Sequence, residues 1–210
     1  MLDSVLSRLG VAADYAAVAD RLASVEGFLH ALEGYALLLL AEHGPGAGAV
    51  VEIGSYLGRS TCFLAFGVKR ASRPAVIAVD HFGGSPEHQA GGSHESGVLV
   101  AEGTTYNQFL RNIDTAGVAQ HVRPIRASST EAARGWREPI RLLFIDGDHS
   151  YEASRDDFAA WSPKVEGNGL VAFHDVGVWT GVTRFYKELL AEGRWRERAK
   201  VRSLRVVGRA

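Results

Sequence analysis

The sequence of 210 residues predicts an α/β protein built on one mostly parallel sheet with helices on both faces. Short β-branched runs alternate with helical patterns from residue 48 onward. One of these runs, residues 142–145, is apolar at every position, as in a strand that is buried on both faces. The chain ends in two alternating runs with no helical pattern between them, which indicates an antiparallel pair closing one edge.

The expected strands follow one another at residues 49–53, 75–79, 122–127, 141–145, 170–173, 195–201 and 203–207. Helical patterns separate the first five strands, so these are expected to be parallel with right-handed crossovers. The helices are expected at about 59–70, 104–115, 130–136, 150–161 and 181–191. Lys and Arg alternate along the last two strands, and this predicts the outward face of an edge strand.

Two further regions are expected to be accessory parts of a single domain covering residues 1–210. Residues 1–45 predict a helical cap with one helix ending at Gly10, a second through Leu22 and a third from Phe28. The apolar face of the third helix is compatible with a homodimer. Residues 81–103 show no periodicity but contain several Gly and His residues, so we expect an active-site lid there, or an insert that is disordered without substrate.

Composition excludes some classes of partner. The formal net charge is −1, so no global field draws the protein to nucleic acid or to a membrane surface. The N-terminal residues lack the basic and apolar regions of a signal peptide, and the longest apolar run, residues 35–41, is too short to cross a bilayer. We therefore expect a cytoplasmic protein with neither a nucleic-acid nor a membrane partner.

The most informative stretch is residues 50–61, Val-Val-Glu-Ile-Gly-Ser-Tyr-Leu-Gly-Arg-Ser-Thr. A strand that turns on glycines into a helix N-terminus favours a nucleotide-type ligand. The spacing differs from the dinucleotide pattern G-x-G-x-x-G. Glu52, at the strand end, would repel a pyrophosphate but suits a cationic ligand such as S-adenosylmethionine (SAM). An ordinary βα turn is the alternative interpretation.

Polar residues also end the next two strands. Asp80 follows a clean apolar strand and is placed to accept hydrogen bonds from ribose hydroxyls. Ser128 and Ser129 follow the third strand, where they could contact an adenine; Ser129 or Thr130 could instead cap the next helix.

A second cluster follows the fourth and fifth strands, with Asp146-Gly-Asp-His149 after one and His174-Asp175 after the other. If these strands are neighbours, the side chains converge. Such a set could hold a divalent cation or form a metal-free hydrogen-bond network. His149 is the natural general base, because imidazole titrates near neutral pH. Asp156 and Asp157 lie on a predicted helix and are expected to be solvated.

Together these motifs resemble the class I SAM-dependent methyltransferases. The matching motifs are Glu52-x-Gly54-x-x-x-Gly58-x-Ser60-Thr61, the strand-ending Asp80, Asp146-Gly-Asp-His-Ser-Tyr151 and His174-Asp175. The resemblance is to the small-molecule O-methyltransferase branch that includes macrolide-sugar and cephalosporin-biosynthesis enzymes. It implies a Rossmann-like seven-stranded methyltransferase sheet of five parallel strands plus a C-terminal antiparallel pair.

The resemblance also implies residue roles. The methionine part of SAM would lie in the glycine turn, the ribose at Asp80 and His81, and the adenine beside Ser128 and Ser129. In the turn, the cofactor-binding residues would be Glu52, Gly54, Ser55, Tyr56, Ser60 and Thr61. Asp146 and Asp175 would be ligands of Mg²⁺ or Mn²⁺, with Asp146 also near the cofactor and His149 acting as the base. His174 stands where the branch has an acidic residue, so a third ligand at that position would be an imidazole, which favours Mn²⁺, Zn²⁺ or iron.

The expected function is therefore metal-assisted O-methylation of a hydroxyl on a small sugar, phenolic or natural-product acceptor. Trp179 could stack on an aromatic or sugar ring of that acceptor. A non-catalytic SAM- or nucleotide-binding regulator is the alternative, although a binding protein has no need for the second cluster. An NAD-dependent oxidoreductase is disfavoured by the missing third glycine and by Glu52.

Overall fold

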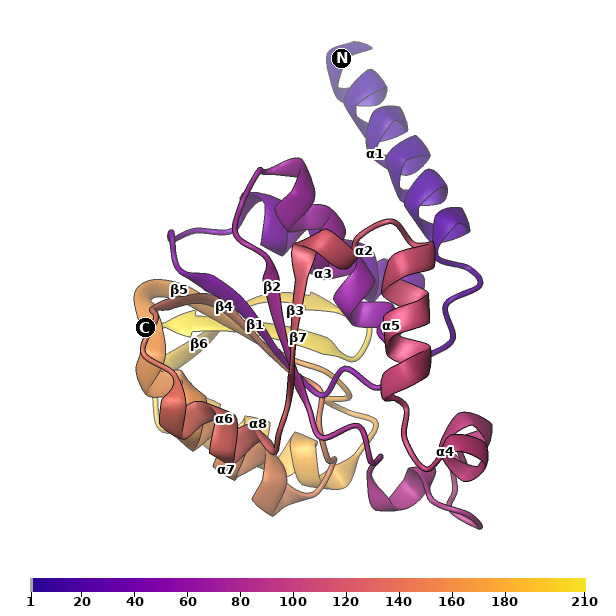
Figure 1. Cartoon of the computed structure of the whole chain (residues 1–210). Coiled ribbons are helices and arrows are strands. Elements are labelled where there is room, and N and C mark those ends of the chain that lie inside the picture. Colours follow the sequence, from indigo (N-terminus) through magenta and orange to yellow (C-terminus); the bar gives the residue numbers. More distant parts are fainter. Residues whose placement is uncertain (1) are drawn as a thin grey trace.

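The computed structural model of the chain describes the backbone of residues 2–210 and the side chains of residues 10–210. At its centre is a seven-stranded sheet with the order β3-β2-β1-β4-β5-β7-β6 (Figure 1). The strands are β1 (Ala49–Ile53), β2 (Val76–Asp80), β3 (Val122–Arg126), β4 (Ile140–Ile145), β5 (Val165–Phe173), β6 (Trp195–Val201) and β7 (Leu204–Arg209). Strands β1 to β5 are parallel, and β7 runs antiparallel to both β5 and β6. The predicted sheet is confirmed.

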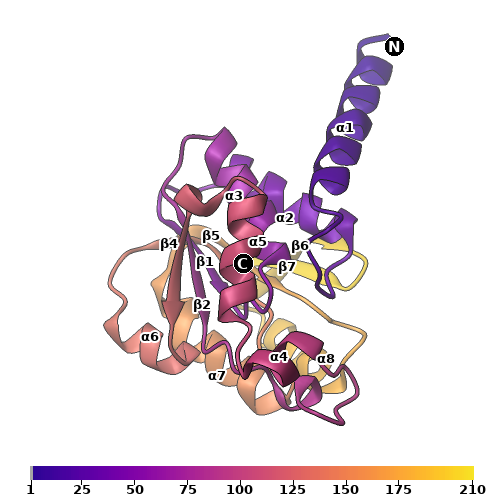
Figure 2. The same cartoon turned by 45° about the vertical axis from the view of Figure 1, so that its right-hand side comes forward.

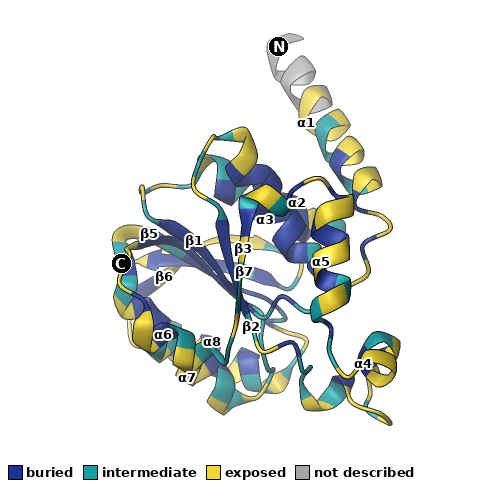
Figure 3. Cartoon of the chain, in the orientation of Figure 1, coloured by how far each residue is buried: buried dark blue, intermediate teal, exposed yellow. Residues whose placement is uncertain are grey.

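Helices cover both faces of this sheet in two layers (Figures 1 and 2). One layer holds α2 (Ala31–His43), α3 (Arg59–Arg70) and α5 (Tyr106–Thr115), and the other holds α6 (Ser129–Gly135), α7 (Tyr151–Trp161) and α8 (Thr180–Ala191). Val50 and Leu142 pack into the first layer, and their neighbours Val51 and Leu143 into the second. Strands β1 and β4 are buried at every position and are drawn in dark blue in Figure 3, which explains their unbroken apolar sequences.

The N-terminal region departs from the prediction in two places. Helix α1 (Leu2–Arg21) continues through Gly10, so the predicted end at that glycine is wrong. One glycine costs a helix only about 1 kcal/mol relative to alanine, which does not end it. The next helix begins at Ala31 rather than Phe28, because His30 caps it and Glu33 completes the capping box. Phe28 therefore lies in a loop, with 59% of its surface exposed.

Residues 81–103 also differ from the expectation, because they contain two short helical elements. The 3₁₀ helix η1 (Pro86–His88) is followed by α4 (Gly97–Glu102), whose N-cap is Ser96. The hydroxyl groups of Tyr56 and Ser96 lie 2.8 Å apart and join this segment to the glycine turn. Two other 3₁₀ turns, η2 (Ala119–His121) and η3 (Ser162–Lys164), precede β3 and β5. Among the described residues, no helix has both the length and the apolar character that crossing a membrane requires.

Candidate active site

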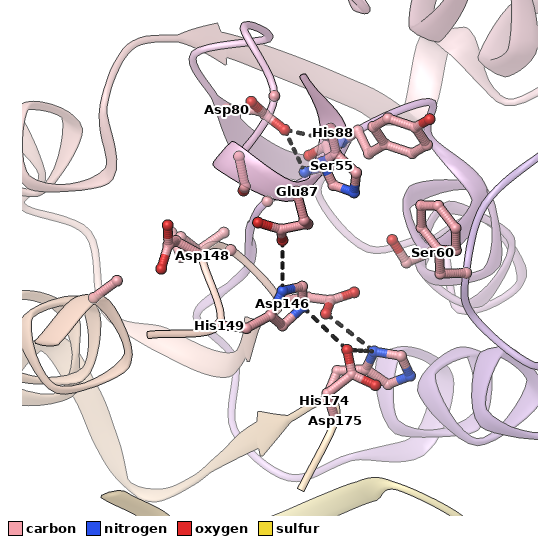
Figure 4. A pocket seen from close by; sticks show the side chains of 18 of the residues that line it. Ser55, Ser60, Asp80, Glu87, His88, Asp146, Asp148, His149, His174 and Asp175 are labelled. Atoms are coloured by element: carbon pink, nitrogen blue, oxygen red, sulfur yellow. Dashed lines mark hydrogen bonds and ion pairs between the residues drawn. The ribbon is translucent and has the colours of Figure 1, made fainter. Parts of the chain in front are cut away.

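A cavity of about 500 Å³ lies at the carboxyl ends of β1, β2, β4 and β5 (Figure 4). The order of the sheet reverses direction between β1 and β4, which is where ligands bind in open α/β sheets. Most of the predicted site residues line this cavity: Gly54, Ser55, Tyr56, Ser60, Asp80, His81, Ser129, Asp146, His149, His174 and Asp175. Glu52, Thr61 and Ser128 do not line it.

The glycine turn is tied to the end of β2 by one carboxylate. Gly54 and Gly58 have φ values of 84° and 89°, in the left-handed region that favours glycine. The backbone N–H groups of Ser55 and Tyr56 donate to Oδ2 of Asp80, at 2.8 and 2.9 Å. The N–H of Phe82 donates to Oδ1 of Asp80 at 2.6 Å. A carboxylate offers about four lone-pair sites, so these three bonds leave about one for a ligand.

Glu52 lies beneath the turn and is fully buried. Its Oε2 accepts hydrogen bonds from the hydroxyls of Ser55, at 2.8 Å, and Thr61, whereas its Oε1 has no partner. Burial raises the pKa of Glu52 to about 7, against the opposing effect of the hydroxyl donors. Glu52 and Thr61 thus support the turn from below.

The two serines after β3, Ser128 and Ser129, have different roles. Ser128 is the N-cap of α6, and Glu131 completes a capping box with it, so the cap is one residue earlier than Ser129 or Thr130. Ser129 faces the cavity, and its Oγ accepts a hydrogen bond from the indole of Trp161 at 2.9 Å.

The second cluster forms because β4 pairs directly with β5, which brings Asp146, His149, His174 and Asp175 together (Figure 4). The ring of His174 has carboxylates on both sides. Its Nδ1 lies 3.0 Å from Asp146 Oδ1 and 3.4 Å from Asp175 Oδ2, and its Nε2 lies 3.3 Å from Glu33 Oε2.

This arrangement makes His174 a buried cation. Burial alone would lower the pKa of His174, but the adjoining carboxylates outweigh it and raise that pKa to about 12. The pKa of Asp175 is in turn held well below its usual range by His149 and His174, despite burial. Both ring nitrogens of His174 therefore face carboxylates, and His174 is not among the side chains whose ligand atoms gather within 4.8 Å of one another.

His149 is the more accessible histidine of the cluster. Its Nε2 lies 3.0 Å from Asp175 Oδ2, and its Nδ1 lies 2.7 Å from Glu87 Oε1. Burial would lower the pKa of His149, but Asp175, Asp146 and Glu87 raise it to about 9, above the near-neutral value expected from sequence. Its ring is parallel to that of Trp179, with 4.8 Å between the centroids.

A metal ion could be held by Asp146, His149 and Asp175. Each offers one ligand atom, and these atoms lie within 4.8 Å of one another. Two carboxylates and one imidazole suit Mn²⁺ as well as Mg²⁺, because imidazole is a better ligand for the former. This set differs from the predicted one by containing His149 in place of His174.

Four contributors to the site were not recognised in the sequence. Glu33 and Glu87 bond to the two histidines, and Glu87 comes from a segment without periodicity that gave no signal. Arg59 orders the loop before α2 by donating to the carbonyls of Leu22, Val25 and Leu29.

The fourth contributor is Asp157, and the prediction that it is solvated is wrong. It is 8% exposed and lines the cavity, and burial raises its pKa to about 6. Its helical spacing from the buried Ser154 and Trp161 is the signal that could have revealed this.

The sequence matches the family described as a methyltransferase domain over residues 51–176. This chain belongs to that family. The match begins in β1 and ends just after Asp175, so it includes both clusters of the cavity. The expected class I SAM-dependent methyltransferase is thereby confirmed in family and fold.

Solved structures share the fold of this methyltransferase domain. The O-methyltransferase NovP has 16% identity and a TM-score of 0.65, with coverage of 85% of this chain and 78% of that one. The O-methyltransferase from Bacillus cereus, solved in complex with SAH (S-adenosylhomocysteine), has 17% identity and a TM-score of 0.62, with coverage of 95% and 89%. The calicheamicin methyltransferase CalS11 has 18% identity and a TM-score of 0.63, with coverage of 84% and 77%. At these identities the likeness shows the fold alone.

A curated relative is the uncharacterized protein y4gI of Sinorhizobium fredii. It is 28% identical over 147 residues, which cover 68% of this chain. The chain spans only 15% of the length of that relative.

Proposed function

We propose that this methyltransferase domain transfers the methyl group of SAM to a hydroxyl oxygen of a small acceptor. The observation that carries the proposal is a single cavity joining the glycine turn and Asp80 to the cluster around His149. Oxygen as the methylated atom is supported by NovP and the Bacillus cereus protein, both described as O-methyltransferases, and by CalS11, described as a TDP-rhamnose 3′-O-methyltransferase.

The residues of the turn fit SAM. The buried Oε1 of Glu52 has no partner, and such an acceptor beneath the turn favours a cationic ligand above it. We infer that Gly54, Ser55, Tyr56 and Ser60 hold the methionine end of SAM. When bound, SAM supplies a methyl group on a sulfonium sulfur. An aligned nucleophile would attack the methyl carbon in line with the carbon–sulfur bond.

At the other end of the cofactor, Asp80 and His81 would hold the ribose, and Ser129 would lie on the adenine side. Thr61 and Ser128 would contribute indirectly, Thr61 through its bond to Glu52 and Ser128 as the cap of α6.

The acid-histidine cluster fits a divalent cation. Asp146 and Asp175 would be the carboxylate ligands, whereas His149 would stay uncoordinated beside them, because an imidazole bound to a cation cannot also take up a proton. A bound cation would lower the pKa of an acceptor hydroxyl and offset the charge of the carboxylates. His174 would remain the fixed positive partner that keeps Asp146 and Asp175 oriented.

We propose that His149 receives the proton of the acceptor hydroxyl. Asp175 and Glu87 hold its two ring nitrogens and therefore fix the ring in the cavity. The carboxylates favour the protonated imidazole, so accepting a proton requires that their charge be offset.

Calorimetric titration tests the proposal. SAH and NAD are titrated separately into the protein, with and without Mg²⁺ or Mn²⁺. We expect saturable heat with SAH and none with NAD. Absence of any heat with SAH contradicts the proposed function, and tighter binding of NAD would favour an oxidoreductase.

A further inference from the structure

Aromatic rings line one side of the cavity in a continuous series, here called the aromatic wall: Phe28, Tyr56, His88, His94 and Trp179. Phe28, Tyr56 and His88 stack on one another, with centroid separations of 4.8 to 5.6 Å. His94 meets Phe28 edge-on at 5.4 Å and reaches Trp179 at 5.7 Å. Trp179 then lies parallel to His149, so the aromatic wall leads directly to the proposed base.

The aromatic wall is assembled from four separate parts of the chain, one of which is the glycine turn that carries Tyr56. Phe28 comes from the loop between α1 and α2, His88 and His94 from residues 81–103, and Trp179 from the N-terminus of α8. Phe28 is 59% exposed although it lines the cavity. A large apolar ring left open to solvent at a cavity mouth is the kind of surface that a ligand covers.

The polar groups of the cavity are largely committed to protein partners. Asp80 accepts three backbone hydrogen bonds, and Glu87 is bonded to His149. Asp146 and Asp175 are paired with the two histidines. A sugar presents several hydroxyls that each need a partner; besides His88 Nδ1 and Thr105 Oγ1, which are buried without a partner among the described residues, the polar groups named above are already bonded within the protein.

Anions are also disfavoured. Six carboxylates line the cavity: Asp80, Glu87, Asp146, Asp148, Asp157 and Asp175. Within the described part of the chain, no Lys, Asn or Gln lines it, and Arg59 is the one Arg that does. Nε and Nη1 of Arg59 donate to three backbone carbonyls, so only its Nη2 group is left for a ligand. Phosphate groups would therefore meet six carboxylates and only one partly engaged guanidinium.

We propose that the acceptor is an aromatic hydroxyl compound, a phenol or catechol without phosphate groups, which packs on the aromatic wall and presents its hydroxyl to His149. This inference rests on the proposed function, because it concerns the acceptor of the same reaction. Offset or edge-on packing of the acceptor ring uses the wall, and the ring needs few hydrogen bonds. In the balanced step, the phenolic oxygen forms a bond to the methyl carbon, the bond from that carbon to sulfur breaks to leave SAH, and the phenolic proton passes to His149.

Separate binding titrations test the inference on the full chain saturated with SAH and Mn²⁺. Catechol, 1-naphthol, methyl α-L-rhamnopyranoside and thymidine diphosphate rhamnose are titrated in turn. We expect at least one of the two phenols to bind tenfold or more tightly than either sugar compound. Tighter binding of a sugar compound than of both phenols overturns the inference, and so does the failure of both phenols to saturate.

Matched variants locate the binding. Trp179→Leu keeps apolar bulk but removes the ring, so phenol affinity should fall about fivefold, whereas Trp179→Phe should stay within twofold of the unsubstituted protein. Phe28→Ala should weaken phenol binding similarly, and Phe28→Tyr should not. Equal affinity in the Leu and Phe variants overturns the inference.

The SAH affinity of the unsubstituted protein separates the failure of the proposed function from the failure of the inference about the acceptor. If the unsubstituted protein binds no SAH, the proposed function fails. If it binds SAH but prefers the sugars, only the aromatic acceptor is wrong.

Discussion

Glu87 Oε1 lies 2.7 Å from Nδ1 of His149, although the two residues are 62 positions apart. Glu87 belongs to the short helix η1 inside residues 81–103, and His149 follows β4. The carboxylate and the imidazole are both mostly buried, with 12% and 16% of their side chains exposed. Residues 81–103 therefore contribute a charged side chain that bonds directly to the proposed base.

This contact predicts that Glu87 positions His149. Glu87→Gln keeps the size of the side chain but weakens the bond to Nδ1, so kcat should fall about tenfold while the KM for SAM stays within twofold. The matched control is Glu95→Gln, which changes an exposed carboxylate of the same segment that bonds only to the Gly91 N–H. An equal loss in both variants would mean that the segment, and not the contact, is what matters.

The metal proposal predicts a loss of cation affinity in Asp175→Asn. Asparagine tolerates the left-handed backbone at this position, where φ is 60°, so the variant removes charge without added strain. Mn²⁺ affinity, measured by calorimetry, should fall at least tenfold while SAH affinity stays within twofold. Asp156→Asn, an exposed change on α7, should alter neither.

The same proposal predicts that EDTA abolishes methyl transfer and that Mg²⁺ or Mn²⁺ restores it. Full activity in EDTA, with no saturable binding of Mn²⁺, would show that the cluster works as a metal-free hydrogen-bond network.

The burial of Glu52 predicts that the free energy of unfolding depends on pH. Its pKa rises from an ordinary 4.5 to about 7 on folding, because the carboxyl group is buried. Between these values the folded state retains a proton that the unfolded state has lost, so stability falls as pH rises. Glu52 therefore contributes ~3 kcal/mol to the free energy of unfolding below about pH 4.5, and this contribution is lost by about pH 7.

Urea unfolding of the ligand-free protein between pH 5 and pH 8 measures this effect. Glu52→Gln should show a shallower decline in stability over that range, whereas the exposed Glu138→Gln should follow the unsubstituted protein. A parallel decline in all three proteins would refute the role of Glu52.

Glu33 predicts a large loss of stability when its charge is removed. It is 2% exposed, and its Oε1 accepts hydrogen bonds from both the N–H and the hydroxyl of Ser203, at 2.8 and 2.7 Å. Its Oε2 faces the His174 ring. Glu33→Gln leaves the buried His174 cation with one fewer carboxylate, which should lower the free energy of unfolding by about 3 kcal/mol. The exposed Glu26→Gln should change it by less than about 0.5 kcal/mol.

The local pattern of the chain was sufficient to predict the sheet and the position of the cavity. The apolar run at β4, the glycine turn after β1 and the basic alternation along β6 are properties of neighbouring residues. Each is set by the chemistry of a short segment, so it is visible without knowledge of the fold. The carboxyl ends of parallel strands share one edge, which is why Asp80 and Asp146 could be placed at the same site.

The tertiary structure decided how these side chains are used. Glu33 is 141 positions from His174, and together they turn an expected metal ligand into a buried cation. His149 gains a raised pKa from carboxylates that reach it from other elements, and Asp157 is buried although its neighbour Asp156 is exposed. The protonation and the free lone pairs of a side chain depend on the groups that folding places within a few ångströms of it. Those groups come from distant parts of the chain, and no pattern within a single segment contains them.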